Sequence, residues 1–409
     1  MIDFLELDIK ISRLLFFILI TFNPINPNPT LFSTITSYEK VANLNTDPIL
    51  PSNSTPVYFR YIGRHGSRFP STKDIHRLQL LIHKLTNLSL GTQFDLSNMR
   101  EISNESHAVN LCDNGRRELL NIGKRFRKRF INIFETDKYR MDFHFESTCK
   151  SRSAESMKMF MHGFLEKEGQ QNTPGSHIKY DMKILECQND STYRFFDICQ
   201  KYTFIHNCLK ETDSETEKFF QLSEIQAITE RINKKIGLSP ENHLKPLELK
   251  SLYISCAYQI LVLNNSLHDV PCKFFDDEAR NAFEYLNDIK HFFKKSNYHD
   301  INLKISTPLI KKVYESTMKA FQNCESENYK SNTPVISGDF GFAHAETIFP
   351  LLGVFKIVDD MKNRESFINH ENYNRIKNNR SFKPSFYTPM AANLMLMVSC
   401  SPTTSQVIF

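Results

Sequence analysis

The feature that most constrains the fold is a hydrophobic run that ends in a basic turn, at Val57–Pro70 (VYFRYIGRHGSRFP). Its first part, Val57–Ile62, is rich in β-branched and aromatic residues and predicts a strand. From Gly63 the run becomes a turn that carries Arg64-His65-Gly66-Ser67-Arg68. Guanidinium groups offer planar pairs of donors to phosphate oxygens, and an unprotonated imidazole can attack phosphorus. A solvated turn would explain an isolated Arg-His pair, but the whole string after a strand predicts a phosphate-binding loop.

Two further strand–loop–helix units carry polar side chains. Met141–Glu146 alternates like a half-buried strand, and the loop after it carries Arg152 close to the expected N-terminus of a helix, where anions are favoured. Thr333–Ile336 predicts a third strand, which a glycine-containing loop connects to His344 and Glu346. Active sites of open α/β sheets lie at the carboxyl ends of the strands, so we expect the three loops to converge on one crevice.

The rest of the chain is predicted to be mainly helical. The segment 166–325 lacks strand alternation, and Asp276 is placed to cap a helix with apolar residues along one face. At 409 residues, the chain has room for one large domain or two of ordinary size. We therefore expect an α/β fold with a mainly parallel sheet flanked by helices and a mostly α-helical inserted domain. The predicted division is 1–36 signal peptide and linker, 37–165 first part of the α/β core, 166–325 helical insert, and 326–409 second part of the core.

The N-terminal region predicts secretion. Leu14–Phe22 is a nine-residue apolar run after a basic pair, too short to span a bilayer but suited to a signal peptide. Acidic residues before the pair fit this interpretation poorly, and a buried core strand is the alternative. The polar tract Asn23–Pro29 favours the signal peptide, because it is typical of a linker. The predicted location is the secretory pathway, in the endoplasmic reticulum lumen or outside the cell.

Cysteine and asparagine usage agrees with secretion. None of the nine cysteines forms a C-x-x-C pair, so neither a zinc knuckle nor a thioredoxin-type site is indicated. In an oxidising lumen we expect disulfides, mostly within 166–325, with one cysteine left over. Glycosylation sequons begin at Asn53, Asn87, Asn104, Asn189, Asn264 and Asn379.

Two other catalytic chemistries are not supported. The order His-x-Glu at 344–346 occurs in zinc deaminases, but these need a downstream Pro-Cys-x-x-Cys, and Pro271-Cys272 lies upstream without a second cysteine. Cys149 is too close to Arg152 to form the Cys-x5-Arg loop of cysteine phosphatases. We therefore expect neither a metal nor a cofactor. The net charge of +5 favours a small anionic substrate and does not indicate nucleic acid.

The string RHGSRFP resembles the RHGxRxP motif of the histidine phosphatase superfamily, in its acid phosphatase and phytase branch. The string HAET at 344–347 resembles the motif of the multiple inositol polyphosphate phosphatases, where other members of the branch carry His-Asp. The resemblance covers roughly residues 57–398 in chain order. It implies that His65 is phosphorylated during the reaction and that Glu346 donates the proton. It also implies that the phosphoryl group is bound by Arg64, Arg68, Arg152 and His344.

The expected function is a phosphomonoesterase that hydrolyses inositol polyphosphates through a phosphohistidine, with bisphosphoglycerate as a further implied substrate. Two alternatives stay open: a broad-specificity histidine acid phosphatase, and a catalytically inactive, secreted phosphate-binding protein. The only partner expected is the small phosphorylated substrate, with no nucleic acid and no membrane span after removal of the signal peptide. The sequence predicts no oligomeric state.

Overall fold

The computed structural model of the chain describes residues 31–42, 55–88, 94–136, 138–165, 178–325, 335–358, 363–400 and 405–408. The predicted signal peptide and linker up to residue 30, and the sequon at Asn53, lie outside these ranges. Within them, no helix combines the length and apolar character that a bilayer crossing requires.

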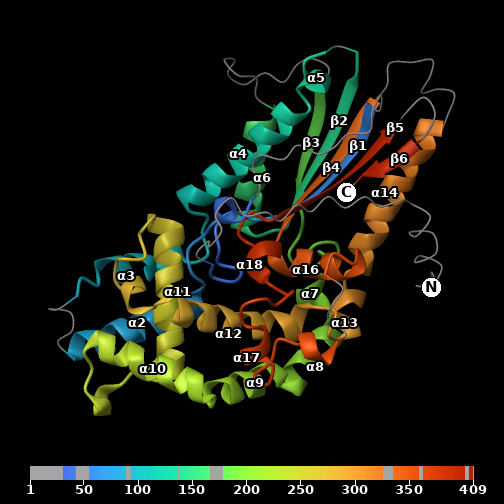
Figure 1. Cartoon of the computed structure of the whole chain (residues 1–409). Helices are drawn as coiled ribbons and strands as arrows, with labels where there is room; N and C mark the ends of the chain where they lie inside the picture. Colours follow the sequence, from blue (N-terminus) through green and yellow to red (C-terminus); the bar gives the residue numbers. More distant parts are fainter. Residues whose placement is uncertain are drawn as a thin grey trace.

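The centre of the molecule is a six-stranded sheet with the order β3-β2-β4-β1-β5-β6 (Figure 1). The neighbours β3, β2, β4 and β1 are parallel, whereas β5 is antiparallel to β1 and β6 is antiparallel to β5. This confirms the predicted, mainly parallel sheet. The strands are β1 (Thr55–Arg64), β2 (Arg140–Ser147), β3 (Ile178–Ile184), β4 (Val335–Ala343), β5 (Asn393–Cys400) and β6 (Ser405–Ile408).

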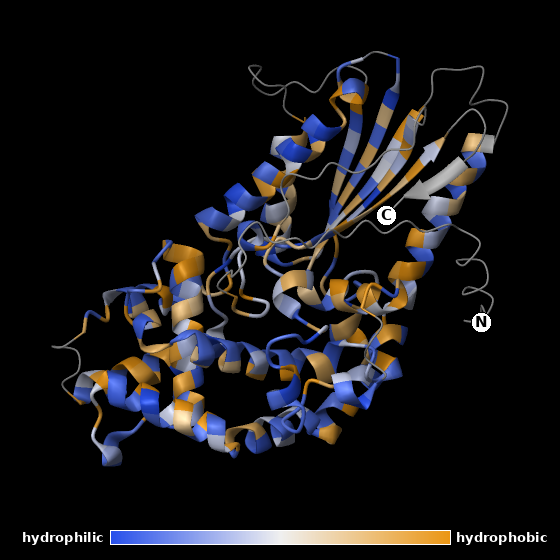
Figure 2. Cartoon of the chain, in the orientation of Figure 1, coloured by the Kyte–Doolittle hydropathy of each residue, from blue (hydrophilic) through white to orange (hydrophobic). Residues whose placement is uncertain are grey.

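Helices cover both faces of the sheet, so the central strand β1 is buried on both sides. Phe59 belongs to a core cluster with α4 (Asp113–Arg129) and α6 (Ser151–Leu165). The neighbouring Tyr58 points to the opposite face and joins a cluster with α14 (Thr307–Glu325). Figure 1 shows α4 and α6 on one side of the sheet and α14 on the other. Figure 2 shows hydrophobic and hydrophilic residues alternating along several strands.

The helices α4 and α6 are in close contact because glycines face each other where they cross. A Cβ atom on Gly123 would lie 2.3 Å from the carbonyl oxygen of Phe160, and one on Gly163 would lie 2.1 Å from that of Leu120. Any side chain at either position would push the two helices apart. This crossing fixes α6, which carries Arg152, against α4, which also contacts the RHGSRFP loop through Glu118.

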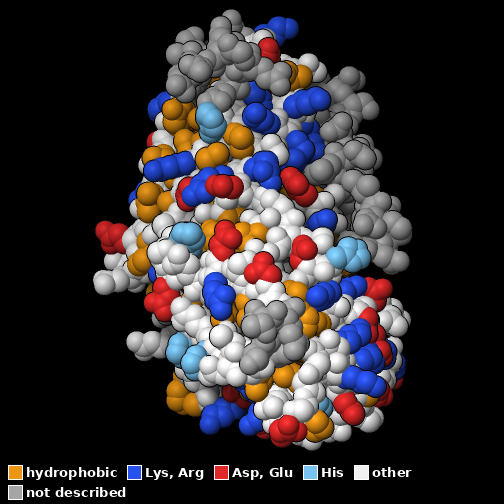
Figure 3. Space-filling model, turned by 90° about the vertical axis from the view of Figure 1, so that its left-hand side faces the viewer, with side chains coloured by type: hydrophobic (Ala, Val, Ile, Leu, Met, Phe, Trp, Pro, Cys, Tyr) orange, Lys and Arg blue, Asp and Glu red, His pale blue; other side chains and the backbone are white. Residues whose placement is uncertain are grey.

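The basic residues of α4 lie on its solvent-facing side, with one exception. Lys124 and Lys128 are exposed, and Figure 3 shows basic side chains gathered on the upper half of the face that includes α4. Arg127 is the exception, because it is buried and its guanidinium donates a hydrogen bond to the carbonyl of Phe164 at 3.1 Å.

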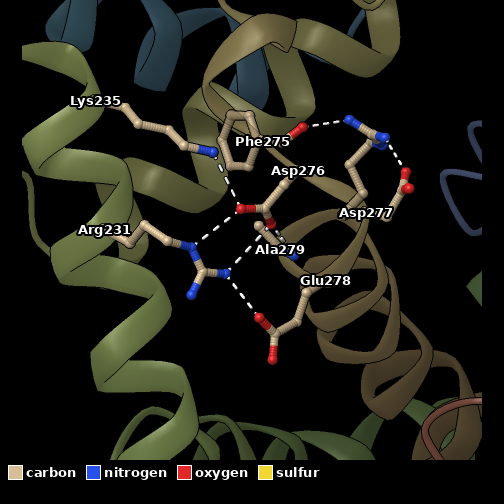
Figure 4. A network of polar contacts seen from close by, with 8 residues as sticks. Arg231, Lys235, Phe275, Asp276, Asp277, Glu278 and Ala279 are labelled. Atoms are coloured by element: carbon tan, nitrogen blue, oxygen red, sulfur yellow. Dashed lines mark hydrogen bonds and ion pairs between the residues drawn. The ribbon is translucent and has the colours of Figure 1, made fainter.

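The lower half of the molecule is helical and has the largest hydrophobic core cluster, to which α2, α10, α11 and α12 contribute (Figure 1). The prediction of a helix capped by Asp276 is confirmed, since its carboxylate accepts a hydrogen bond from the N–H of Ala279 at 2.9 Å. Arg231 and Lys235 of α10 form ion pairs with the same carboxylate and thereby fasten α10 to the start of α12 (Figure 4).

Besides α4, α6 and α14, the α-helices have the following bounds: α2 (Thr72–Asn87), α3 (Ser97–Ile102), α5 (Ile131–Phe134), α7 (Phe195–Ile198), α8 (Gln200–Leu209), α9 (Glu211–Phe220), α10 (Ser223–Ile236), α11 (Pro246–Leu263), α12 (Asp277–Lys295), α13 (Asp300–Lys304), α16 (Ala345–Val354), α17 (Tyr373–Ile376) and α18 (Pro384–Tyr387).

Two strands differ from the sequence prediction. The segment 337–343, expected to be a loop, continues β4 to Ala343, because it pairs with both β1 and β2 and buries Phe340 and Phe342. Gly341 is paired within this strand. The position has no room for a side chain, because a Cβ there would lie 2.4 Å from the hydroxyl of Tyr193. Strand β3 lies inside the segment assigned to the helical insert and pairs with β2. The division of the chain into domains stays a prediction.

The disulfides are distributed differently from the sequence expectation. Cys256–Cys272 lies within the segment 166–325, but Cys149–Cys187 and Cys324–Cys400 connect that segment to the α/β core. Three cysteines stay unpaired instead of one: Cys112, Cys199 and Cys208. Pairing depends on Cα atoms lying about 5–6 Å apart in the fold, which spacing along the chain does not reveal.

Candidate active site

The carboxyl ends of three adjacent parallel strands bring the predicted site residues together. The order β2-β4-β1 places the loops after Ser147, Ala343 and Arg64 at the same edge of the sheet. Backbone hydrogen bonds continue past the strand ends, from the N–H of His65 to the carbonyl of Ala343 (3.1 Å) and from that of Thr148 to the carbonyl of Phe342 (3.1 Å). The convergence expected from the three strand–loop–helix units is therefore present.

His65 is buried and held as a neutral imidazole. Its Nδ1 lies 2.9 Å from the carbonyl oxygen of Gly66, so the proton belongs on Nδ1 and Nε2 keeps its lone pair. Burial lowers the pKa of His65 well below its usual value, and the positive charges of Arg152 and Arg64 lower it further. A neutral imidazole with a free Nε2 is the form that can act as a nucleophile.

Glu118 of α4 fixes the loop that carries His65. Its carboxylate accepts hydrogen bonds from the N–H of Ser67 at 2.8 Å and from the Ser67 hydroxyl at 2.9 Å. The hydroxyl of Ser37 donates to the same carboxylate at 3.0 Å. Gly66 fits between the loop and α4 only without a side chain, since a Cβ there would lie 2.4 Å from the carbonyl oxygen of Gly115. The loop is thus pre-organised before any ligand binds.

Arg64 and Arg152 bring positive charge into the site, and neither forms an ion pair with a carboxylate of the part of the chain that the structure describes. The guanidinium of Arg64 donates to the carbonyl oxygens of Thr34 (2.6 Å) and Thr388 (2.7 Å), and Arg152 lies in the first turn of α6. Burial, and then the charge of Arg68, lowers the pKa of Arg64 to about 10 and that of Arg152 to about 10. Burial disfavours these cations in the empty site, so an anion bound among them would stabilise them.

His344 forms the opposite side of the site. Its ring centroid lies 5.6 Å from that of His65, and its Nε2 lies 3.1 Å from the hydroxyl of Thr148 and 3.1 Å from Nη1 of Arg194. Burial, followed by the charge of Arg152, lowers the pKa of His344 well below its usual value. A guanidinium faces each ring nitrogen, Arg194 at Nε2 and Arg152 at Nδ1 (3.5 Å). Because the contact of Arg194 is the shorter one, Nε2 is the acceptor and the proton of the neutral ring belongs on Nδ1.

Glu346, at the start of α16, is the carboxylate of the site. Its side chain is 36% exposed, and its Oε1 lies 2.6 Å from Nζ of Lys295, whose side chain is only 9% exposed. Burial raises the pKa of Glu346, but the charge and the hydrogen bond of Lys295 outweigh this and hold the pKa well below its usual value. The carboxylate therefore carries its charge in the empty site.

Several guanidinium N–H groups of the site have no acceptor. Among the described residues, no partner contacts the buried Nε atoms of four arginines: Arg64, Arg68, Arg152 and Arg194. Buried donors without acceptors are rare in folded proteins, and a cluster of them indicates where a ligand supplies the oxygens. The site thus has the charge and the donors for a phosphoryl group.

The structure places all six predicted site residues in this site and adds Arg194, Lys295 and Glu118. The first follows a loop and the other two lie on helices, and none belongs to a strand–loop motif. Their proximity to His65 depends on contacts between segments far apart in sequence. The string Tyr193–Asp197 (YRFFD), in which Arg194 stands among aromatic residues, is the signal in the sequence that could have indicated Arg194.

Comparison with known proteins agrees with this geometry. A family model described as the histidine phosphatase superfamily (branch 2) matches residues 60–407. The chain belongs to this superfamily. It is 25% identical to multiple inositol polyphosphate phosphatase 1 of Gallus gallus over 389 residues, covering 92% of this chain and 82% of the relative. It is 24% identical to the Homo sapiens protein of the same name, covering 90% of this chain and 77% of the relative.

Solved structures show the same fold. The apo form of the multiple inositol polyphosphate phosphatase of Bifidobacterium longum superposes with a TM-score of 0.68 and 16% identity, over 92% of this chain and 89% of that chain. The phytase from D. castellii superposes with a TM-score of 0.63 and 16% identity, over 92% and 76% of the two chains. These similarities establish the histidine phosphatase fold for this chain.

Proposed function

We propose that this protein is a hydrolase that removes phosphate groups from inositol polyphosphates through a phosphohistidine on His65. The observation that carries the proposal is a neutral, buried His65 facing arginines whose buried Nε atoms lack acceptors. The names of the relatives from Gallus gallus and Homo sapiens support the same substrate class. A phosphoryl group would bind Arg64, Arg68, Arg152 and His344.

In the first step, Nε2 of His65 attacks phosphorus and the bond to the inositol oxygen breaks. Glu346 gives its proton to the leaving oxygen, which becomes the hydroxyl of the product. In the second step, the Glu346 carboxylate takes a proton from a water molecule, whose oxygen attacks the phosphohistidine and releases inorganic phosphate. The arginines stabilise the charge that develops on the phosphoryl oxygens in both steps.

Lysines on α11 and α12 favour a substrate with several phosphates, because the charge of one of them, Lys290, also acts on Lys295 of the site. Burial lowers the pKa of Lys294 on α12, and the charges of Lys290 and Lys73 lower it further. Burial and the charges of Lys290 and Arg77 also lower the pKa of Lys250 on α11, to about 8. Such mutual repulsion is relieved when anionic groups lie among the cations, as they would with additional phosphates on the inositol ring.

The test is phosphate release from inositol hexakisphosphate without added metal, by wild type, His65→Ala and Glu346→Gln, with the exposed Lys128→Ala as matched control. We expect His65→Ala to lose at least about 1,000-fold in rate and Glu346→Gln about 100-fold or more. The control should keep wild-type activity. Release from an aryl phosphate alone would indicate a broad-specificity acid phosphatase, and no release from either would indicate an inactive phosphate-binding protein.

We also propose that the protein enters the secretory pathway. Three disulfides support this, since disulfides persist in oxidising compartments. Each sequon asparagine within the described ranges is exposed, as glycosylation requires: Asn87, Asn104, Asn189, Asn264 and Asn379. Thiol titration of the denatured, unreduced protein should find three free thiols among nine cysteines. Nine free thiols would contradict the assignment.

A further inference from the structure

A general acid must carry a proton when the substrate arrives at the transition state, yet the empty site holds Glu346 as a carboxylate. The carboxylate has a buried ammonium group at 2.6 Å, on a lysine of α12 that no strand–loop motif predicts. The same ammonium lies 5.5 Å from the ring centroid of Phe349, so it is confined between α12 and α16. Lys295 is therefore built into the site as a fixed positive charge behind Glu346.

We propose that Lys295 is a positioning residue that keeps Glu346 ionised in the empty site, so that Glu346 takes up its proton only when a polyanionic substrate binds. The proposal rests on the proposed function and deepens it by adding a control of the proton donor. Binding of several phosphates would place negative charge around Glu346 and offset the effect of Lys295. Glu346 would then take a proton from solvent, and it would donate that proton to the inositol oxygen.

The surroundings of Glu346 support such a coupling, because nearly all of them are positively charged or neutral. From its own segment it is faced by His344, and from α12 by Lys295 and His291. The groups from the other elements are Arg64 of β1, Arg152 of α6, Arg194 before α7, and Tyr202 of α8. Each of the three arginines interacts electrostatically with Glu346, so a polyanion bound among them would neutralise charges that favour the ionised carboxyl.

Such a control of the proton donor would favour substrates with several phosphates over monophosphates. A monophosphate brings one dianion and can offset only part of the positive charge around Glu346. A polyphosphate brings more negative charge, so it prepares the acid that its own cleavage requires. Lys295 would thereby make proton donation depend on the number of phosphates on the substrate.

The test measures proton uptake when inositol hexasulfate binds, because this ligand has no groups that titrate near neutral pH and is not hydrolysed. Calorimetry in buffers of different ionisation enthalpy, from pH 4 to pH 6, gives the protons taken up per ligand. The comparison of wild type with Glu346→Gln isolates the contribution of Glu346 from that of the buried histidines. We expect wild type to take up about half a proton or more beyond Glu346→Gln near about pH 4.3, the ordinary pKa of a glutamic acid.

Removal of the ammonium should abolish this difference. With Lys295→Met, the pKa of Glu346 in the empty site should rise by about 1–3 units, so Glu346 is already protonated and its uptake on binding disappears. In the kinetic profile for inositol hexakisphosphate, the alkaline limb of kcat/KM should move up by the same 1–3 units while that of kcat stays nearly fixed. Lys295→Arg keeps the charge and should restore wild-type uptake.

A lysine with a purely structural role would give a different result. In that case Lys295→Met would lower stability but keep the uptake that depends on Glu346, and this outcome would overturn the proposal. Equal uptake by wild type and Glu346→Gln, or no binding of inositol hexasulfate to wild type, would overturn it as well. The proposed function is judged separately, by phosphate release from inositol hexakisphosphate, so the two can fail independently.

Discussion

Two buried clusters of charged side chains that contain arginine are built in opposite ways. Between α12 and the segment after α17, the side chain of Arg380 is fully buried and its Nη2 lies 2.8 Å from carboxylate oxygens of both Glu284 and Asp288. At the edge of the sheet, Arg64 and Arg152 have no carboxylate within ion-pair distance among the described residues. In the first cluster the fold itself supplies carboxylates to the arginine, whereas the second cluster has more positive than negative charge.

The pKa values of the arginines reflect this difference. Burial lowers the pKa of Arg380, but the charges of Asp288 and Glu284 outweigh burial and raise it above its usual value. For Arg64 and Arg152, burial and neighbouring cations act together and lower the pKa to about 10. A fold that pairs its buried charges in one region can leave them unpaired in another only if a ligand completes the second region.

The strongest test of the comparison removes the paired arginine. Arg380→Met leaves Asp288 buried without its arginine and Glu284 with only Lys383 at 4.0 Å, and should lower the free energy of unfolding by about 3–5 kcal/mol. Urea denaturation measures the loss. The exposed Lys128→Met should stay within about 0.5 kcal/mol of wild type. A loss below about 1 kcal/mol for Arg380→Met would mean that this cluster does not contribute to stability as proposed.

The next test removes an unpaired arginine. Arg152→Met should lower kcat/KM for inositol hexakisphosphate about 100- to 1,000-fold, because a donor to the transition state is lost. Its free energy of unfolding should stay the same or increase, since a buried cation without a partner disappears. Steady-state kinetics and urea denaturation of the same preparation measure both. Destabilisation as large as that of Arg380→Met would contradict the difference between the clusters.

A smaller effect concerns pH, because the unpaired cluster also keeps histidines neutral. Burial and neighbouring cations lower the pKa of His65, His344 and His291. The unfolded chain binds protons at these histidines below about pH 6.5 and the folded chain does not, so stability falls as pH falls. Each histidine contributes up to about 1.4 kcal/mol per pH unit. His65→Ala should reduce the slope between pH 5 and pH 6.5 by up to that amount, and an unchanged slope would show that His65 titrates normally.

The smallest effect is expected at the solvent-exposed cluster of Figure 4. Asp276→Ala removes the cap of α12 and the ion pairs to α10, and should cost about 1 kcal/mol, mostly from the cap. Asp276→Asn keeps a capping oxygen and should lose only a few tenths of a kcal/mol. Thermal denaturation of the three proteins distinguishes the contributions. An equal loss in both variants would assign the stability to the ion pairs.

The sequence by itself determined which residues could form the site. A β-branched and aromatic run located β1, and hydrophobic alternation located β2. The rule that sites lie at strand carboxyl ends brought His65, Arg152 and His344 together. These patterns are local, because they depend on the conformational preferences of residues that are neighbours in the sequence. The sequence predicted β4 less well, because the glycines of 337–343 indicated a loop until pairing on both sides and contact with Tyr193 were known.

Only the tertiary structure decided how the charges of the site are balanced. Lys295 is 51 positions from Glu346, and Arg194 is 150 positions from His344, yet each pair is in hydrogen-bonding contact. Disulfide partners and the carboxylates around Arg380 are likewise far apart along the chain. Burial and ion pairing depend on what the fold brings near a group, so the sequence supplies the titratable groups and the tertiary structure decides which of them carry charge.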